Sequence, residues 1–340
     1  MKRYLIFILL VLPFFSLAQS YDFIPLNGET STSFRGMSVV SDKIAWISGS
    51  GGTIGRTIDG GKTWEWIKPQ GYEKLDFRDI EAFSADKAIV VNAGSPAYIL
   101  LTEDGGKSWK ESYKNLDSAI FLDGMDFWDI NRGIAFGDPI NGKMQLLRTL
   151  DGGRTWNDIS ATMQAKMGVG EASFAASGTT ICAMGEGKVW IATGGTVSNI
   201  YYSSNYGSTW QIAACPILQG QNSTGPFSIA FLNETIGVVV GGDYTKDKEN
   251  ENNILLSTDA GQTWSKPAKP VSGFRSGVIY LSEKVMLATG TSGTDVSNDG
   301  GKIWYNISDL SFNVIKKSTQ GDLVLLAGNK GQIYQLSVSK

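Results

Sequence analysis

A pattern of four short segments, each alternating between apolar and polar residues, repeats along most of the chain. Such alternation is typical of strands that bury one face. In the first copy the segments are residues 34–40, 43–49, 52–58 and 64–68. In the second copy they are residues 77–83, 88–93, 97–102 and 109–113. Later copies are predicted to begin with strands at 125–128, 173–176, 227–232 and 278–281. The chain is therefore predicted to be all-β, with four strands in each repeat.

An eight-residue turn, Ser/Thr-x-Asp-x-Gly-x-Thr-Trp, connects the third strand of each copy to the fourth. It occurs six times, at 57–64, 102–109, 149–156, 203–210, 257–264 and 297–304. The Asp can accept hydrogen bonds from backbone N–H groups about two residues on, glycine takes angles that other residues avoid, and the Trp packs against apolar neighbours. We assign a structural role to the third and last residues of each turn: Asp59, Trp64, Asp104, Trp109, Asp151, Trp156, Asn205, Trp210, Asp259, Trp264, Asp299 and Trp304.

The final stretch of the chain holds three strands and no such turn. They are predicted at 312–316, 323–328 and 332–338. The N-terminal segment 21–25 aligns with the fourth strand of the first copy, and it can supply the strand that is missing. Pairing the two ends would close the sheets into a ring and leave only short edges. We predict one seven-bladed β-propeller over residues 19–340, with four-stranded blades and the last blade closed by the N-terminal strand.

The first 18 residues have the pattern of an export signal. Lys2 and Arg3 precede an apolar run at 4–17, and Ser16 and Ala18 are small residues at the positions that a signal peptidase recognises. We predict cleavage after Ala18 and a periplasmic or secreted protein. The alternative is an uncleaved membrane anchor, although the run is short for a span of about 20 residues.

The amino-acid composition limits the kinds of ligand and catalysis that can be expected. The 340 residues include 41 Gly and no His, and the net charge is −3. Without His, the commonest general base and transition-metal ligand is missing, and we expect no metal or cofactor. A nucleic-acid surface would need clustered excess Lys and Arg, so nucleic acid is not expected as a partner. Cys182 and Cys215 are too few for a disulfide scaffold, and whether they pair stays open.

Candidate binding residues gather on the propeller face away from the repeated turns. The first strands of the blades begin there, and the loops between second and third strands lie beside them. Three arginines, Arg35, Arg78 and Arg275, are expected at these strand starts, together with Asp123, Glu171, Phe227 and Asn313. The loops add Asp138, Asp243 and Tyr244. Guanidinium groups suit the carboxylates of an acidic partner segment. The alternative is a structural network in which the arginines pair with Asp123, Glu171 and Asp79.

The repeated turn is that of the Asp-box, or BNR, repeat, and the whole chain resembles the Ycf48-like photosystem II assembly factors. They share the single seven-bladed ring and boxes ending in Asp-Gly-Gly-x-Thr-Trp. The resemblance implies a non-catalytic, monomeric scaffold that binds a protein partner, whether membrane-associated or not. It does not imply that the organism is photosynthetic.

The alternative function is a sialidase-like glycosidase with an acidic sugar substrate. Sialidases also carry Asp-boxes, and Phe34-Arg35 resembles the Phe-Arg that opens their propellers. That resemblance would make Arg35, Arg78 and Arg275 the carboxylate-binding trio, pair Tyr244 with Glu171 as nucleophile and partner, and make Asp138 the acid. However, sialidase propellers have six blades, and Gly36-Met37 replaces the Ile-Pro of their motif.

Overall fold

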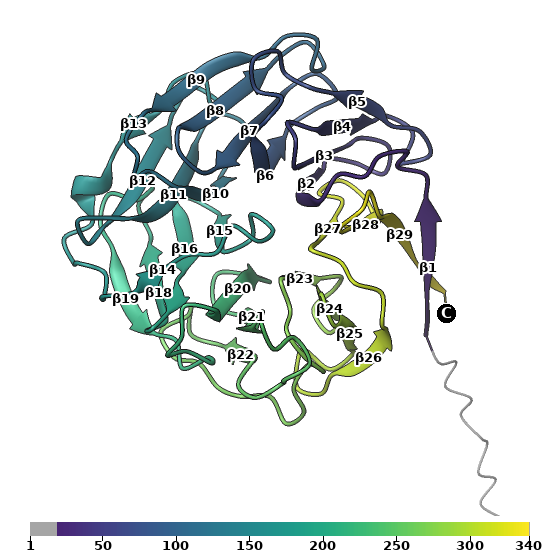
Figure 1. The fold of residues 1–340 in the computed structure, drawn as a ribbon. Coiled ribbons are helices and arrows are strands. Elements are labelled where there is room, and N and C mark those ends of the chain that lie inside the picture. The colour runs from purple at the N-terminus through teal and green to yellow at the C-terminus, as the bar shows by residue number, and fades with distance from the viewer. Residues whose placement is uncertain (1–18, 340) are drawn as a thin grey trace, which may run out of the picture.

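The computed structural model describes residues 19–339, and these form a ring of seven blades around a central channel (Figure 1). The prediction of an all-β, seven-bladed propeller is confirmed. The expected signal peptide, residues 1–18, lies outside the described residues. No helix within residues 19–339 is long and apolar enough to cross a bilayer.

The blades follow one another along the chain. Blade one contains β2 (Phe34–Val39), β3 (Ala45–Gly49), β4 (Ile54–Thr57) and β5 (Glu65–Ile67). Blade two contains β6 (Asp76–Ala82), β7 (Ala88–Ala93), β8 (Ala97–Thr102) and β9 (Lys110–Asn115). Blade three contains β10 (Leu122–Phe127), β11 (Gly133–Ile140), β12 (Lys143–Thr149) and β13 (Asn157–Asp158), followed by a 3-10 turn, η1 (Ser160–Thr162). Blade four contains β15 (Ile181–Met184), β16 (Lys188–Ala192), β18 (Asn199–Ser203) and β19 (Gln211–Ala214).

The remaining blades complete the ring. Blade five contains β20 (Thr224–Phe231), β21 (Gly237–Asp243) and β22 (Ile254–Ser257), and its outer edge is a bridge between Leu256 and Ser265. Blade six contains β23 (Gly277–Tyr280), β24 (Met286–Gly290), β25 (Gly293–Ser297) and β26 (Tyr305–Ser308). Blade seven contains β27 (Val314–Lys317), β28 (Val324–Ala327), β29 (Ile333–Ser339) and β1 (Ser20–Leu26).

The N-terminal strand closes the ring as predicted. β1 runs antiparallel to β29, and the register extends from Ser20 opposite Ser339 to Leu26 opposite Ile333 (Figure 1). Seven paired positions join two segments that are more than 300 residues apart in sequence. This closure leaves no broad open sheet edge in the ring.

Blade four differs from the prediction. Its first strand is β15, so the prediction of a first strand at residues 173–176 was wrong. Residues 173–180 instead form a loop that projects into the channel beside β15 (Figure 1). A short pair, β14 (Glu171–Ala172) with β17 (Gly194–Gly195), precedes this loop. The loop is rich in Ala, Ser, Gly and Thr, and such small side chains fit a narrow channel better than the apolar Ile181 to Met184 segment, which pairs with β16.

Each box turn bonds to itself as predicted, although its carboxylate reaches further than two residues. Asp59 Oδ1 accepts the backbone N–H of Thr63 at 2.9 Å, and Oδ2 accepts the Thr63 hydroxyl at 2.7 Å. The Thr57 hydroxyl donates to Asp59 and accepts the Gly61 N–H, each at 2.9 Å. These bonds lower the pKa of Asp59 to about 2, and the bond from the Thr63 hydroxyl has the largest effect.

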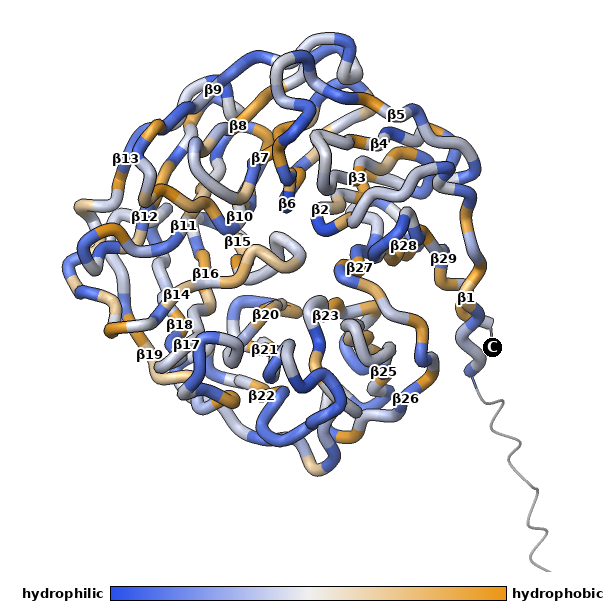
Figure 2. The backbone as a smooth tube through the Cα atoms, viewed as in Figure 1, coloured by the Kyte–Doolittle hydropathy of each residue, from blue (hydrophilic) through white to orange (hydrophobic). Residues whose placement is uncertain are grey.

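Apolar side chains fill the spaces between adjacent blades. Trp46 and Trp190 are fully buried, and orange apolar stretches alternate with polar ones along the inner strands (Figure 2). Cys182 and Cys215 pack in the same cluster between blades four and five, and both are free thiols. The core is therefore a ring of inter-blade clusters, and it leaves the loops of each face free to vary.

Candidate functional site

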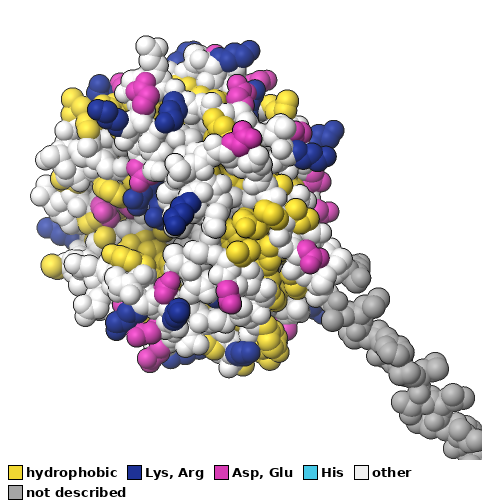
Figure 3. Space-filling view, turned by 45° about the vertical axis from the view of Figure 1, so that its right-hand side comes forward, with side chains coloured by type: hydrophobic (Ala, Val, Ile, Leu, Met, Phe, Trp, Pro, Cys, Tyr) yellow, Lys and Arg dark blue, Asp and Glu magenta, His cyan; other side chains and the backbone are white. Residues whose placement is uncertain are grey.

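A hollow of about 400 Å³ opens at the channel mouth, on the face away from the box turns. All seven blades contribute to its lining, mainly through the starts of their first strands and nearby loops. In the space-filling view, basic side chains lie beside a hollow near the middle of this face, next to hydrophobic ones (Figure 3). The ring thus brings together residues that are spread from Arg35 to Asn329 in the sequence.

Two of the three predicted arginines line this hollow. Arg35 on β2 donates from Nη1 to the Ala176 carbonyl at 3.3 Å, and Arg78 on β6 donates to the Ala175 carbonyl at 3.3 Å. Arg78 also pairs through Nε with Asp76, at 2.8 Å. Arg35 forms no ion pair with any carboxylate in residues 19–339. Burial, and then the charge of Arg78, lower the pKa of Arg35.

The loop 173–180 forms the floor of the hollow and ties distant blades together. Its Ala175 and Ala176 carbonyls accept the arginine bonds from blades one and two. On the other side, Ser177 Oγ donates to the Ser276 carbonyl at 2.6 Å, and the Thr179 carbonyl accepts the Ile229 N–H at 2.8 Å. The loop therefore links both sides of the channel, and its residues 173–176 line the hollow next to the arginines.

Aromatic side chains form the wall opposite the arginines. Phe174 of the loop stacks on Phe227 of β20, with ring centroids 4.0 Å apart. Phe274 and Tyr244 pack edge-on against Phe227, at 4.7 and 6.0 Å. Tyr244 remains 53% exposed, so the upper part of this wall faces solvent. The hollow thus has a cationic side and an apolar, aromatic side.

Two predicted carboxyl groups lie next to each other at the edge of the site. Asp123 is 1% exposed, and no N–H or hydroxyl donor in residues 19–339 reaches its carboxyl oxygens. Burial, and then the charge of Asp138, raise the pKa of Asp123 well above its ordinary value. Asp138 lines the hollow, and its Oδ1 accepts the Ser173 N–H at 3.0 Å. Burial also raises the pKa of Asp138.

Three other predicted site residues have structural contacts instead. Arg275 is fully buried and pairs with Asp295, to which Nε donates at 2.7 Å, so it does not join Arg35 and Arg78. Glu171 is also buried, and it accepts bonds from Thr193 and Tyr201 at 2.5 and 2.9 Å. Asp243 caps its own loop by accepting the Thr245 N–H at 2.9 Å. The expected ring of three arginines at the mouth is therefore corrected to a pair.

Deeper in the channel, three carboxyl groups surround one lysine. Lys316 Nζ on β27 lies 3.8 Å from Glu81 Oε1 on β6. Burial raises the pKa of Glu81 to about 8 and that of Asp79 to about 7, and it also raises the pKa of Asp126. Asp79 accepts two backbone N–H bonds, from Ile80 and Met125, at 2.9 and 2.8 Å. Within residues 19–339, no group of three or more His, Cys, Asp or Glu side chains is placed to hold a metal ion.

The sequence interpretation missed the loop and most of the aromatic wall. Phe121 and Phe274 line the hollow but lie outside the predicted strand starts and loops, and Phe174 was placed in the predicted strand 173–176 without being named as a site residue. One signal was present, because 54 residues separate Trp156 from Trp210, against 47 between Trp109 and Trp156. The extra length belongs in part to the channel loop. Phe227 and Asn313, predicted at strand starts, do line the hollow.

Comparison with known proteins agrees with this architecture. Residues 17–117 match the family model of the photosynthesis system II assembly factor YCF48, and residues 255–266 match the BNR/Asp-box repeat. No curated protein matches the chain. Among solved structures, YCF48 bound to D1 peptide is 19% identical, over 93% of this chain and 96% of that chain, with a TM-score of 0.61. YCF48 from Cyanidioschyzon merolae is 17% identical, over 93% and 98%, with a TM-score of 0.64.

A glycosidase shares the fold as well. The GH74 xyloglucanase from Xanthomonas campestris is 14% identical, over 93% of this chain but 53% of that chain, with a TM-score of 0.62. At such identities the structural likeness concerns the fold, and function must be argued from the site. The chain is thus a seven-bladed β-propeller with Asp-box turns, and it resembles the Ycf48-like photosystem II assembly factors.

Proposed function

We propose that this protein is a non-catalytic binding scaffold that holds an acidic segment of a protein partner at its channel mouth. The observation that carries the proposal is the arginine pair. Arg35 and Arg78 lie close enough for the charge of one to lower the pKa of the other, and Arg35 has no carboxylate partner in residues 19–339. A half-buried guanidinium beside a like charge is unfavourable alone, and a carboxylate that enters the hollow would relieve it.

The aromatic wall adds a second requirement for the partner. A segment whose carboxylate reaches Arg35 would place its neighbouring side chain against Phe174, Phe227 and Tyr244. Burying an apolar side chain there would contribute about 1.5–3 kcal/mol. We therefore propose a segment in which an acidic residue adjoins a bulky apolar one. The fold likeness to YCF48 bound to D1 peptide supports a peptide as the ligand class.

The placement of the sialidase-like residues favours binding over glycoside hydrolysis. That activity would use three arginines together, yet Arg275 is buried against Asp295. It would also pair Tyr244 with Glu171, yet Glu171 is buried against Thr193 and Tyr201, away from the hollow. Carbohydrate binding is therefore an outcome to be tested, not a second proposal.

The proposal can be tested by crosslinked pull-down from the native envelope fraction. Wild type is compared with an Arg35→Met, Arg78→Met double variant and with Arg154→Met, which removes an exposed arginine on the box face. We expect wild type and Arg154→Met to retain a defined protein that the double variant loses. Retention by the double variant would refute the site, and hydrolysis of a fluorogenic sialoside by wild type would refute the non-catalytic role. We also propose export, and the mature chain from this fraction should begin at Gln19.

A further inference from the structure

Six blades fill the same position on the box face with a turn, and blade seven does not. In each box, the N–H of the fourth residue donates to a carbonyl in the turn between the first and second strands of its own blade. The N···O distances lie between 2.8 and 3.0 Å. The pairs are Gly60 to Lys43, Gly105 to Asp86, Gly152 to Asn131, Tyr206 to Gly187, Ala260 to Thr235 and Gly300 to Lys284.

The register of blade seven shows what is missing. Leu336 lies opposite Val324, as Thr57, the first residue of a box, lies opposite Ala45. Here β29 does not turn but continues to Ser339, paired with β1. Asp322 stands two residues before Val324, where Lys43 stands before Ala45. No N–H within residues 19–339 donates to the Asp322 carbonyl, so the acceptor that a box would use is open.

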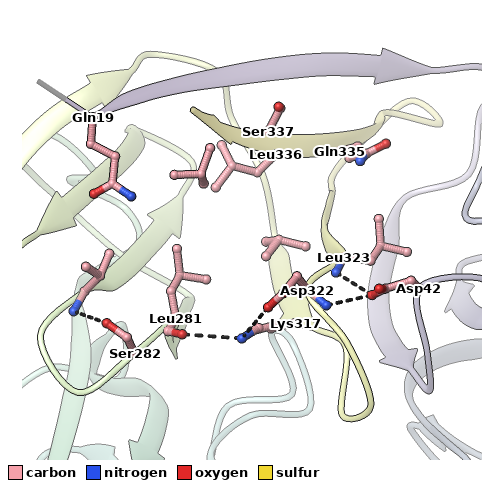
Figure 4. Close-up of a pocket in the computed structure, with 13 residues that line it drawn as sticks. Gln19, Asp42, Leu281, Ser282, Lys317, Asp322, Leu323, Gln335, Leu336 and Ser337 are labelled. Carbon is pink, nitrogen blue, oxygen red and sulfur yellow. Dashed lines mark hydrogen bonds and ion pairs between the residues drawn. The ribbon is translucent and has the colours of Figure 1, made fainter. Parts of the chain in front are cut away.

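A groove of about 610 Å³ occupies this position, between blades six and seven (Figure 4). Leu281 and Val285 of blade six face Leu323, Leu336 and Val338 of blade seven across it. A box normally packs in such a gap, since Gly61 of blade one lies against Leu26 and Leu325 of the preceding blade seven. The groove therefore keeps apolar walls at a box position that has no turn. Phe23 of β1 stands by register where Trp64 stands in blade one, and it packs in the cluster between blades six and seven.

The charges of the groove also suit a box-like occupant. Its charged lining residues are Asp42, Asp322 and Lys317, which leave one negative charge in excess. The Asp42 carboxylate accepts the Asp322 and Leu323 N–H groups at 2.7 and 2.8 Å, and Lys317 pairs with Asp322 at 3.3 Å (Figure 4). Four of the six boxes carry a basic residue at their sixth position: Lys62, Lys107, Arg154 and Lys302.

We propose that this groove is a docking site for a partner polypeptide that inserts a turn bearing an aromatic side chain and a basic residue. The partner supplies the seventh box: its ring enters the apolar walls, a backbone N–H bonds to the Asp322 carbonyl, and its basic residue meets the acidic excess. The groove lies on the box face, opposite the arginine pair. The propeller can then hold two partners at once, and this inference does not depend on the one at the channel mouth.

The test uses a backbone-cyclised peptide with the sequence of residues 57–64, added to the mature protein and followed by fluorescence anisotropy. We expect saturable binding that weakens at least tenfold when Ala replaces the Trp of the peptide. Val338→Trp fills the groove from β29, where Val338 is 38% exposed, and should abolish binding. Leu150→Trp makes the same kind of change at an exposed position of box three and should leave binding intact.

Several outcomes would overturn the inference. Absence of saturable binding to wild type, or equal binding to Val338→Trp, would remove the groove as the site. Equal binding of the Ala peptide would remove the aromatic occupant. A dimer in sedimentation that Val338→Trp dissociates would instead identify a second copy of the chain as the occupant. If Val338→Trp melts well below wild type, a photoreactive peptide bound to wild type replaces it as the test. Crosslinks outside residues 281–285 and 335–338 would then decide against the groove.

Discussion

Polar side chains in the box turns have hydrogen-bond partners within the turn, whereas some polar side chains at the channel mouth lack partners. In a box, the Asp59 carboxylate bonds to Thr57 and Thr63 within one short turn, and these bonds lower its pKa to about 2. At the mouth, Arg35 lacks an ion-pair partner and Asp123 lacks a donor, among residues 19–339. Repeated local contacts therefore stabilise the fold, and polar groups that the fold leaves unsatisfied mark the place where a ligand can contribute.

Arg275 was predicted at the channel mouth, yet its polar groups have partners within the fold. Like Arg35, it was predicted at the start of its first strand, but the two positions are not equivalent. Gly277 lies opposite Thr289 as Gly36 lies opposite Ser48, so Ser276 takes the place of Arg35 and Arg275 takes that of the buried Phe34. Arg275 is buried against Asp295, Ser292 and the Phe274 carbonyl, so its contacts resemble those of a box more than those of the mouth. A shift of one position along a strand thus turns a channel-lining side chain into a core one, and the following predictions test that difference.

The largest effect is expected from Arg275→Met. The substitution leaves Asp295 buried without its counter-ion, which should cost about 3–5 kcal/mol of unfolding free energy. Arg35→Met makes the same chemical change at the mouth and should alter stability by less than about 0.5 kcal/mol. Urea unfolding of both variants at one pH measures the difference. Equal losses would show that Arg35 is as structural as Arg275, which would contradict the comparison.

A smaller loss is expected from Asp59→Ala in the first box. The turn loses the bonds that Asp59 accepts from Thr57 and Thr63, at a cost of about 2 kcal/mol. Asp59→Asn should cost less, because Asn205 in the fourth box still accepts the Thr209 N–H at 2.9 Å. Thermal unfolding of the two variants provides the measurement. An Asn variant as unstable as the Ala variant would show that the charge, not the bonding pattern, holds the turn.

The smallest effect concerns the carboxyl groups deep in the channel. Burial raises the pKa of Glu81 to about 8, above the 4.5 of an unperturbed group, so the folded protein holds this proton to higher pH. This contribution to stability is complete below pH 4.5 and is lost as the pH rises through 8. Asp79 and Asp126 share these surroundings and take up part of the proton binding when Glu81 is replaced, so we expect Glu81→Gln to reduce the fall in stability between pH 5 and 9 by about 1 kcal/mol. The unfolding free energies of wild type and Glu81→Gln are measured across this pH range. If the two pH profiles coincide, the assignment to Glu81 is wrong.

The sequence alone was enough for the architecture and not for the details of the site. The seven blades, their order and the closure by residues 20–26 follow from alternation and from the six boxes, because these signals are local and recur. Arg35, Arg78, Asp138 and Tyr244 were predicted on one face and do line one hollow. Blade four was mispredicted because most of the bonds of its loop are made outside the repeat, with blades one, two, five and six.

Periodicity by itself determined most of the strands and the turns that join them, since the Asp side chain of each box bonds within eight residues. Only the tertiary structure decided which arginines are available. Asp295 lies 20 residues from Arg275 in sequence, and Ala176 lies 141 from Arg35, so neither contact follows from a local pattern. The groove of blade seven has the same origin, because it exists only where two chain ends pair without a turn. Hydrogen bonds within a box specify the repeated blade. The packing of blades around the ring determines which arginines and which groove remain accessible.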